Sequence, residues 1–159
     1  MKLFVMRHGH SPSLGEAGVL KDEDRPLSRH GHLDAADMAK RLLEKEGTPQ
    51  IILASPLKRA VETAKQAYSI LKPLKGIHIF EPLSNRVSAD TLYTHIRKEI
   101  AGVSQALVVG HQPQLGEFTA FLTGRSIAIR PAGIVALELG EPDDKRAELL
   151  WFLNPELPL

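Results

Sequence analysis

The residues most suited to chemistry form a short polar cluster directly after the apolar run Leu3 to Met6. Arg7 and His8 begin this cluster, and Gly9 follows them. A guanidinium presents a planar set of donors that suits phosphate oxygens, while a neutral imidazole can be a nucleophile, a base or a metal ligand. Glycine allows a sharp turn and a close approach of the backbone to a ligand. The cluster therefore predicts an anion site with a reactive histidine.

Two further polar clusters follow apolar runs later in the chain. Residues 55–59 come after the run 51–53, and Gly110-His111 comes after the run 106–109. Short apolar runs of this kind are typical of central parallel strands, which are covered on both faces. Ligand crevices of open α/β sheets lie at the carboxyl ends of such strands. We therefore expect all three clusters to meet at one crevice, where two arginines and two histidines favour a phosphate group.

The rest of the pattern predicts strands that alternate with helices and a C-terminal pair of strands joined by a polar loop. The expected fold is an α/β three-layer sandwich, with helices on both faces of a mostly parallel sheet that has an antiparallel end. We expect one domain over residues 1–159, in which residues 11–27 form a long loop beside the first strand. The expected strands are 3–6, 51–53, 77–80, 106–109, 134–139 and 148–153, and the expected helices are 28–46, 55–71, 89–100 and 113–122. In the first helix, the expected apolar face is formed by Leu33, Ala36, Ala39, Leu42 and Leu43.

Composition limits the possible functions. Lys and Arg number 20 and Asp and Glu number 19, so no strong net charge favours nucleic acid or a membrane surface. The absence of cysteine excludes a disulfide framework, a thiolate nucleophile and a cysteine zinc site. The four-residue apolar run at the N-terminus is too short for a signal peptide, and no run reaches transmembrane length. We therefore expect a cytoplasmic protein that binds neither nucleic acid nor membrane.

The three clusters together resemble the motifs of the histidine phosphatase superfamily, which has the phosphoglycerate-mutase-like fold. Arg7-His8-Gly9 resembles the first motif, Ser-Pro-x-x-Arg-Ala-x-x-Thr-Ala over residues 55–64 resembles the second, and Gly110-His111 resembles the third. They appear in the order in which the family has them. The resemblance implies that His8 is the phosphorylated nucleophile, and that Arg7, Gly9, Arg59 and His111 bind the phosphoryl group.

The resemblance also implies a role for a carboxylic acid. Family members that act on oxygen esters use such an acid to protonate the departing oxygen. Glu81, directly after the expected third strand, is the best-placed candidate, although it is equally consistent with a solvated loop carboxylate beside Pro82. The acidic run 22–24 is expected to be a solvated loop.

Two His-x-His pairs, His8 with His10 and His30 with His32, raise the alternative of a metal site. The carboxylates that usually complete a hydrolase metal site are not adjacent to them. His30 and His32 also fall in the first turn of an expected helix, where residues two apart point in different directions. Two arginines can supply the positive charge that a metal would provide. We therefore expect no metal and no other cofactor.

The length and layout look most like the short branch of the superfamily, the SixA-type phosphohistidine phosphatases. Between the second and third motifs there is room for only one strand, one loop and one helix, so the crevice should be open. The resemblance implies that the substrate is phosphohistidine of a signalling protein. The cationic residues that would flank the opening are Lys21, Arg25, Arg29 and Lys58.

Other functions stay open at this point. The same fold also suits a phosphatase that acts on small phosphorylated molecules or other phosphomonoesters. A module that binds phosphorylated ligands without turnover would keep the arginines, but His8 argues against it. A metal-dependent hydrolase would use the His-x-His pairs.

Overall fold

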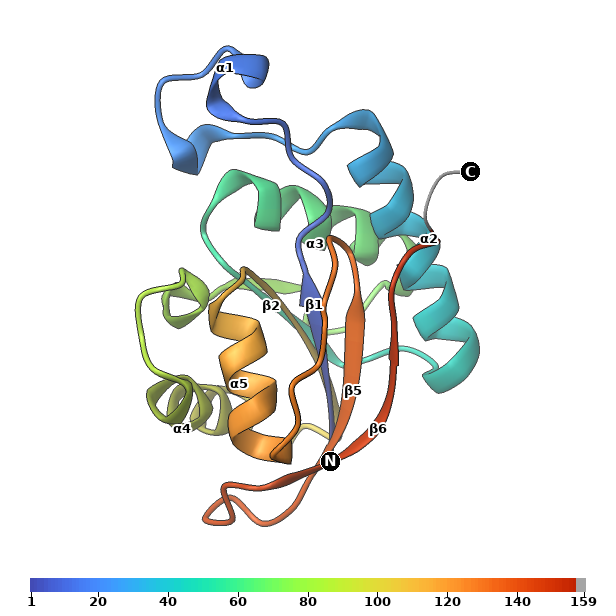
Figure 1. Ribbon diagram of the computed structural model, residues 1–159. Coiled ribbons are helices and arrows are strands. Elements are labelled where there is room, and N and C mark those ends of the chain that lie inside the picture. The colour runs from blue at the N-terminus through green and yellow to red at the C-terminus, as the bar shows by residue number, and fades with distance from the viewer. Residues whose placement is uncertain (157–159) are drawn as a thin grey trace.

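The computed structural model describes residues 1–156, and its centre is a six-stranded sheet (Figure 1). The strands are β1 (Lys2–Arg7), β2 (Ile51–Ala54), β3 (Ile77–Ile79), β4 (Gln105–Gly110), β5 (Ile134–Leu139) and β6 (Ala147–Leu153). They lie in the order β3-β2-β4-β1-β5-β6. The four strands β1 to β4 are parallel, while β5 is antiparallel to β1 and β6 is antiparallel to β5. The expected sheet is thus confirmed; residues 157–159 of the expected domain lie outside the described residues.

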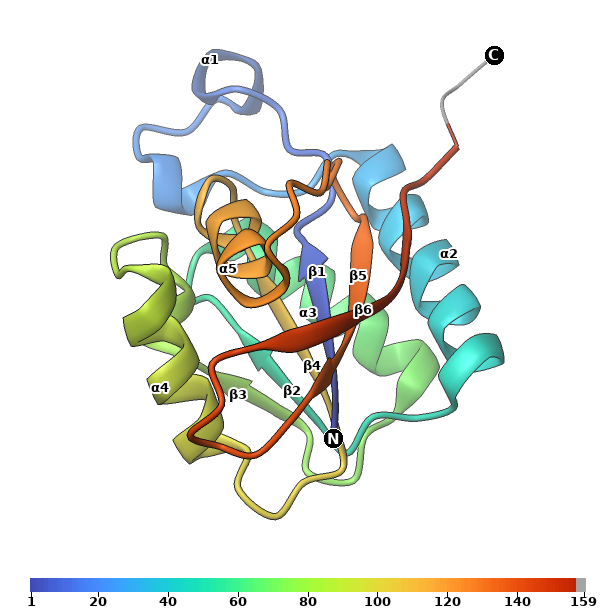
Figure 2. The same ribbon diagram turned by 60° about the horizontal axis from the view of Figure 1, so that its bottom comes forward.

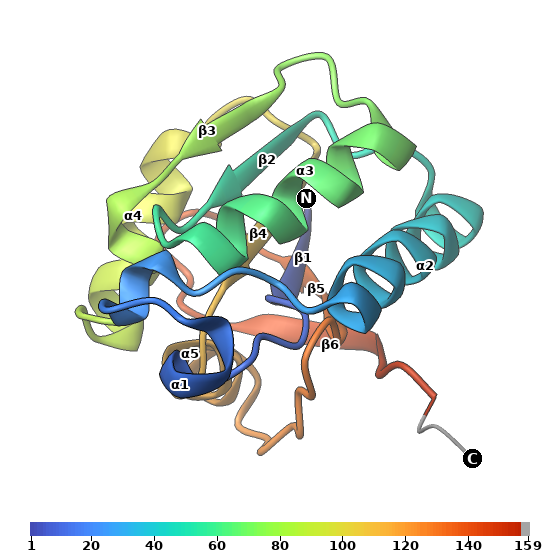
Figure 3. The same cartoon turned by 90° about the horizontal axis from the view of Figure 1, so that it is seen from above.

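Helices cover both faces of this sheet (Figures 2 and 3). The longer helices are α2 (Arg29–Glu46), α3 (Lys58–Leu71), α4 (Ala89–Glu99) and α5 (Gln114–Thr123). Successive strand residues point to opposite faces, so in β1 Leu3 packs in one apolar cluster with residues of α4 and α5, and Phe4 packs in a second with residues of α2 and α3. Burial on both faces explains the continuous apolar runs and confirms the expected sandwich. No helix within residues 1–156 has the length and apolar character needed to span a membrane.

Two local expectations are wrong. The helix expected from Ser55 begins at Lys58, and its N-cap residue is Leu57, whose side chain cannot form a capping bond. The Ser55 hydroxyl accepts a bond from the Leu57 N–H over 3.3 Å and also lies against His111. Leu33 of α2 was expected to face inward, but it is 61% exposed. The buried stripe of α2 starts at Gly31. A residue two positions along a helix lies roughly 200° around the axis, which turns Leu33 to solvent.

The loop expected over residues 11–27 contains two short helical segments, α1 (Leu14–Ala17) and η1 (Asp22–Asp24). Ser13 and Glu16 form a reciprocal capping box at the start of α1. Neither segment has a buried residue. Figure 1 shows this part of the chain above the carboxyl end of β1. Polar contacts, and not apolar packing, must therefore hold it in place. A third short segment, η2 (Glu81–Leu83), follows β3.

Candidate active site

The central pair of strands brings the two motif histidines together. β1 and β4 are parallel neighbours, with Arg7 opposite Gly110. His8 and His111 each follow one residue later, so they leave the sheet at the same edge. Their ring centroids are 5.1 Å apart, with an angle of 53° between the ring planes. Arg59 lies in the first turn of α3, which follows β2, the other neighbour of β4.

The environment of His8 fixes which of its nitrogens is reactive. Nδ1 lies 2.7 Å from the carbonyl oxygen of Gly9. A carbonyl oxygen only accepts hydrogen bonds, so Nδ1 carries the proton and Nε2 bears the lone pair. Burial lowers the pKa of His8 to about 3, and the nearby His111, Arg59 and Arg7 act in the same direction. The imidazole is therefore neutral at pH 7, as a nucleophile requires.

His111 and Arg7 each carry a buried polar atom without a partner. The Nε2 atom of His111 lies 2.7 Å from the Ser55 hydroxyl, and burial together with the nearby Arg59 lowers the pKa of His111 to about 4. Arg7 donates one bond, from NH1 to the carbonyl of Ile129 over 3.1 Å. Among the described residues, His111 Nδ1 and Arg7 Nε have no hydrogen-bond partner. Buried polar atoms are nearly always paired. Arg7 Nε–H can therefore donate to the oxygens of a ligand, and so can His111 Nδ1–H in the tautomer in which the Ser55 hydroxyl donates to Nε2.

Arg59 contacts a residue that was expected to be solvated. Its guanidinium is largely buried, and NH1 donates to the backbone carbonyl of Asp22 over 2.8 Å while NH2 donates to Asp22 Oδ2 over 3.0 Å. The segment η1 folds back toward the start of α3 and makes this contact. Residues 22–24 are exposed, as expected, but Asp22 also makes a specific contact with Arg59, which the sequence did not predict.

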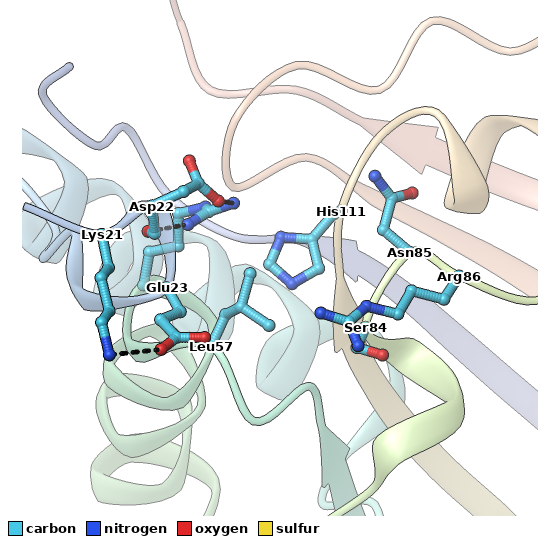
Figure 4. A pocket seen from close by; sticks show the side chains of 9 residues that line it. Lys21, Asp22, Glu23, Leu57, Ser84, Asn85, Arg86 and His111 are labelled. Carbon is cyan, nitrogen blue, oxygen red and sulfur yellow. Dashed lines mark hydrogen bonds and ion pairs between the residues drawn. The ribbon is translucent and has the colours of Figure 1, made fainter. Parts of the chain in front are cut away.

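A pocket of about 530 Å³ lies between η1 and the loop after η2 (Figure 4). Residues 21–23 stand on one side of it and residues 84–86 on the other. This size is typical of small-ligand sites. Arg7 and His8 lie outside the lining, although the His8 ring contacts that of His111. The lining residues are Lys21, Asp22, Glu23, Leu57, Arg59, Ser84, Asn85, Arg86 and His111.

Glu81 does not line this pocket. It lies in η2, where Oε1 accepts a hydrogen bond from the Ser84 hydroxyl over 3.1 Å, and it lines a neighbouring pocket of about 620 Å³ that also contains Lys58. Of the other cations expected at the opening, Lys21 lines the first pocket and Arg29 lines neither. Glu81 thus lines a different pocket from Arg59 and His111, and the two pockets adjoin each other.

Thr63 joins the first two motifs, a role that the sequence reasoning missed. Its hydroxyl accepts a bond from the Gly9 backbone N–H over 3.0 Å and donates to the Arg59 carbonyl over 2.8 Å. The Gly9 N–H, expected to serve a phosphate, is therefore already paired. A Cβ atom at Gly9 would lie 2.7 Å from the carbonyl oxygen of Gly31, so only glycine fits. The one available signal was the place of Thr63 within the second motif.

The His-x-His pairs do not converge on one point. His8 contacts Gly9 and His111, whereas His10 Nδ1 lies 2.8 Å from the Ser28 hydroxyl and the His10 ring stacks on that of His30, with centroids 4.2 Å apart. Within residues 1–156, no group of three or more His, Cys, Asp or Glu side chains is arranged to hold a metal ion.

Comparison with known proteins defines the class. Residues 3–86 match the family model of the histidine phosphatase superfamily (branch 1), and the chain belongs to this superfamily. It is 31% identical to a phosphohistidine phosphatase SixA homolog of Haemophilus influenzae, over 97% of this chain and 90% of the relative. It is 33% identical to an uncharacterised protein of Picosynechococcus sp., over 88% of this chain and 86% of that one.

Solved structures place the fold more narrowly. The structure of the protein histidine phosphatase SixA complexed with tungstate superimposes with a TM-score of 0.86, at 23% identity and covering 96% of both chains. The fold is therefore SixA-like, which confirms the resemblance and the phosphoglycerate-mutase-like architecture that the motifs implied. Membership of the family also supports phosphatase activity.

Proposed function

We propose that this protein is a phosphohistidine phosphatase in which His8 is the phosphorylated nucleophile. The observation that carries the proposal is the hydrogen bond between His8 Nδ1 and the Gly9 carbonyl, because it leaves the Nε2 lone pair of a neutral imidazole free. His111 lies beside that ring. Arg7 and His111 each have an unpaired buried nitrogen that can bind a phosphoryl oxygen.

The reaction proceeds in two steps. In the first, His8 Nε2 attacks phosphorus, the bond from phosphorus to the leaving group breaks, and the leaving group departs with a proton. In the second, water attacks the phosphorus of phospho-His8, which releases inorganic phosphate and restores the imidazole. Dividing hydrolysis in this way replaces one high barrier by two lower ones. Arg7, Arg59 and His111 stabilise the charge on the phosphoryl oxygens in both steps.

Phosphohistidine of a signalling protein is the proposed substrate. An imidazole leaving group that is protonated on its other nitrogen departs neutral, so it needs no strong acid at the moment of cleavage. This fits the position of Glu81 outside the pocket that Arg59 and His111 line. The similarity to a phosphohistidine phosphatase SixA homolog points in the same direction.

The alternative is a phosphatase for small or other phosphomonoesters. One observation favours it: the pocket that contains Glu81 adjoins the proposed site and shares four lining residues with it, Glu23, Leu57, Ser84 and Arg86. A small shift of η2 itself would bring the Glu81 carboxyl group closer to an ester oxygen in that site.

Rapid-quench trapping with three substrates tests the proposal. Wild-type protein should form an acid-labile, base-stable phosphoryl adduct during turnover of a phosphohistidine protein, and should turn over a sugar phosphate and an aryl phosphate more slowly. His8→Ala should give neither adduct nor turnover, while His95→Ala, which removes an exposed histidine from α4, should behave as wild type. Full activity of His8→Ala would contradict the nucleophile, and a preference for the sugar phosphate would favour the alternative.

A further inference from the structure

We propose that Asp22 is a positioning residue that orients the Arg59 guanidinium toward a bound phosphoryl group. The proposal rests on the proposed function, since the phosphoryl group is the ligand that Arg59 would bind. It concerns a residue outside the three motifs. Asp22 lies in η1, 37 positions before Arg59 in the chain.

The contact between the two residues restrains the guanidinium at two points. Asp22 uses its backbone carbonyl for NH1 and its carboxylate for NH2. Two hydrogen bonds to different nitrogens fix both the position and the plane of the group, which one contact would not do. A guanidinium has five N–H donors, so three remain for a ligand. Among the described residues, the Arg59 side chain makes no other hydrogen bond, so Asp22 determines its orientation.

Asp22 is itself held in place from the other side. Arg25 NH1 contacts Asp22 Oδ1 over 3.0 Å, while Arg25 Nε donates to the Pro12 carbonyl over 2.8 Å and NH2 to the Ser11 carbonyl over 3.2 Å. A chain of polar contacts thus runs from the backbone just after the first motif, through Arg25 and Asp22, to Arg59. The hydrogen bonds from Arg25 and Arg59 lower the pKa of Asp22, which keeps its carboxylate ionised at pH 7.

A second possible role of Asp22 would change the affinity for the ligand in the opposite direction. A carboxylate on Arg59 could also occupy donors that a phosphoryl group needs, in which case its removal would strengthen binding of the ligand. Positioning predicts weaker binding on removal, because a guanidinium that must be ordered on binding loses affinity. The two possibilities therefore differ in the direction of one measurable change.

Tungstate binding to Asp22→Asn decides between them. Asparagine keeps the size of the side chain and the backbone carbonyl contact, but it removes the charge. We expect weaker tungstate binding by calorimetry and a kcat/KM on phosphohistidine protein that is lower by about 10- to 100-fold, as small displacements of catalytic groups produce. Asp24→Asn removes the same charge from the same short helix and should change neither value. Unchanged or tighter tungstate binding in Asp22→Asn would overturn the proposal.

A double-mutant cycle with Arg59→Lys separates positioning from a general structural role. If Asp22 acts through Arg59, Asp22→Asn should cost little tungstate affinity once Arg59 is lysine, whereas a structural role would give additive losses. Asp22 is 57% exposed, so Asp22→Asn should keep the wild-type melting temperature. Tungstate binding needs no turnover: a chain that binds it in an Asp22-dependent way but does not hydrolyse phosphohistidine would support this inference and refute the proposed function.

Discussion

The Nδ1 atom of His8 lies 2.7 Å from the carbonyl oxygen of the next residue, Gly9. The imidazole is therefore held in one tautomer by its own backbone. This contact raises the pKa of His8, but burial lowers it more strongly. Because burial lowers the pKa of His8, the stability of the folded protein should depend on pH.

The free energy of unfolding should fall as the pH falls below about 6.5. The folded-state pKa values of His8 and His111 are about 3 and about 4, against 6.5 for an ordinary histidine. Unfolded imidazoles therefore take up protons that the folded ones do not, and this difference favours unfolding. Urea titrations between pH 7.5 and 5.5 check the slope. His111→Asn should lose stability less steeply over this range, and His95→Ala should keep the wild-type slope; equal slopes in all three would contradict the prediction.

Arg59→Lys should lower kcat/KM by ~10²–10³, because a point charge cannot replace a planar fork of preorganised donors. Steady-state kinetics on phosphohistidine protein measure the loss. Arg125→Lys, which changes an exposed arginine after α5, is the matched control. Wild-type kinetics in Arg59→Lys would show that Arg59 takes no part in the reaction.

Thr63→Val should lower the free energy of unfolding by about 1–3 kcal/mol, the cost of leaving a buried donor unpaired. The substitution keeps the shape of the side chain but removes the acceptor of the Gly9 N–H. Thr119→Val is a suitable control, since the Thr119 hydroxyl is also buried but only donates to a carbonyl of its own helix. Denaturant titrations compare the two. Equal losses of unfolding free energy in the two variants would mean that the bond from the Gly9 N–H to Thr63 does not contribute to stability.

Glu81→Gln should leave kcat/KM on phosphohistidine protein close to wild type and should reduce it more on alkyl phosphates. The reason is that an alkoxide needs a proton as it departs, whereas a protonated imidazole does not. The value of kcat/KM is measured on both substrates for wild type and for Glu81→Gln. A large loss of kcat/KM on phosphohistidine protein would show that Glu81 takes part in the cleavage of that substrate.

Dialysis against a chelator should leave the activity unchanged, because arginines supply the positive charge at the phosphoryl group. The test compares turnover before dialysis, after it, and after addition of zinc or manganese. Activity that disappears on dialysis and returns with either metal would contradict the prediction and would favour a metal site at the His-x-His pairs.

The parts of the site that the sequence could predict are those carried by local patterns. The apolar runs before Arg7 and His111 define strand ends, and parallel strand ends share an edge, so the meeting of the motifs follows from general rules. Asp22 could not be placed in this way, because its contact with Arg59 depends on how η1, a segment with no buried residue, folds back. The orientation of Leu33 was predicted wrongly because the buried side of α2 begins at Gly31, which lies against the His10 backbone and offers no apolar side chain as a signal.

The pairing of β1 with β4 has a consequence for how the protein acquires activity. Lys2 lies opposite Gln105, so the two histidines meet only after the chain has closed a loop of about a hundred residues. Contacts between such distant positions form late and slowly in folding. A nascent or truncated chain that lacks β4 would hold His8 without its partner. Any phosphoryl transfer at this site thus depends on the pairing of β1 with β4, and a chain that ends before β4 would have an incomplete site.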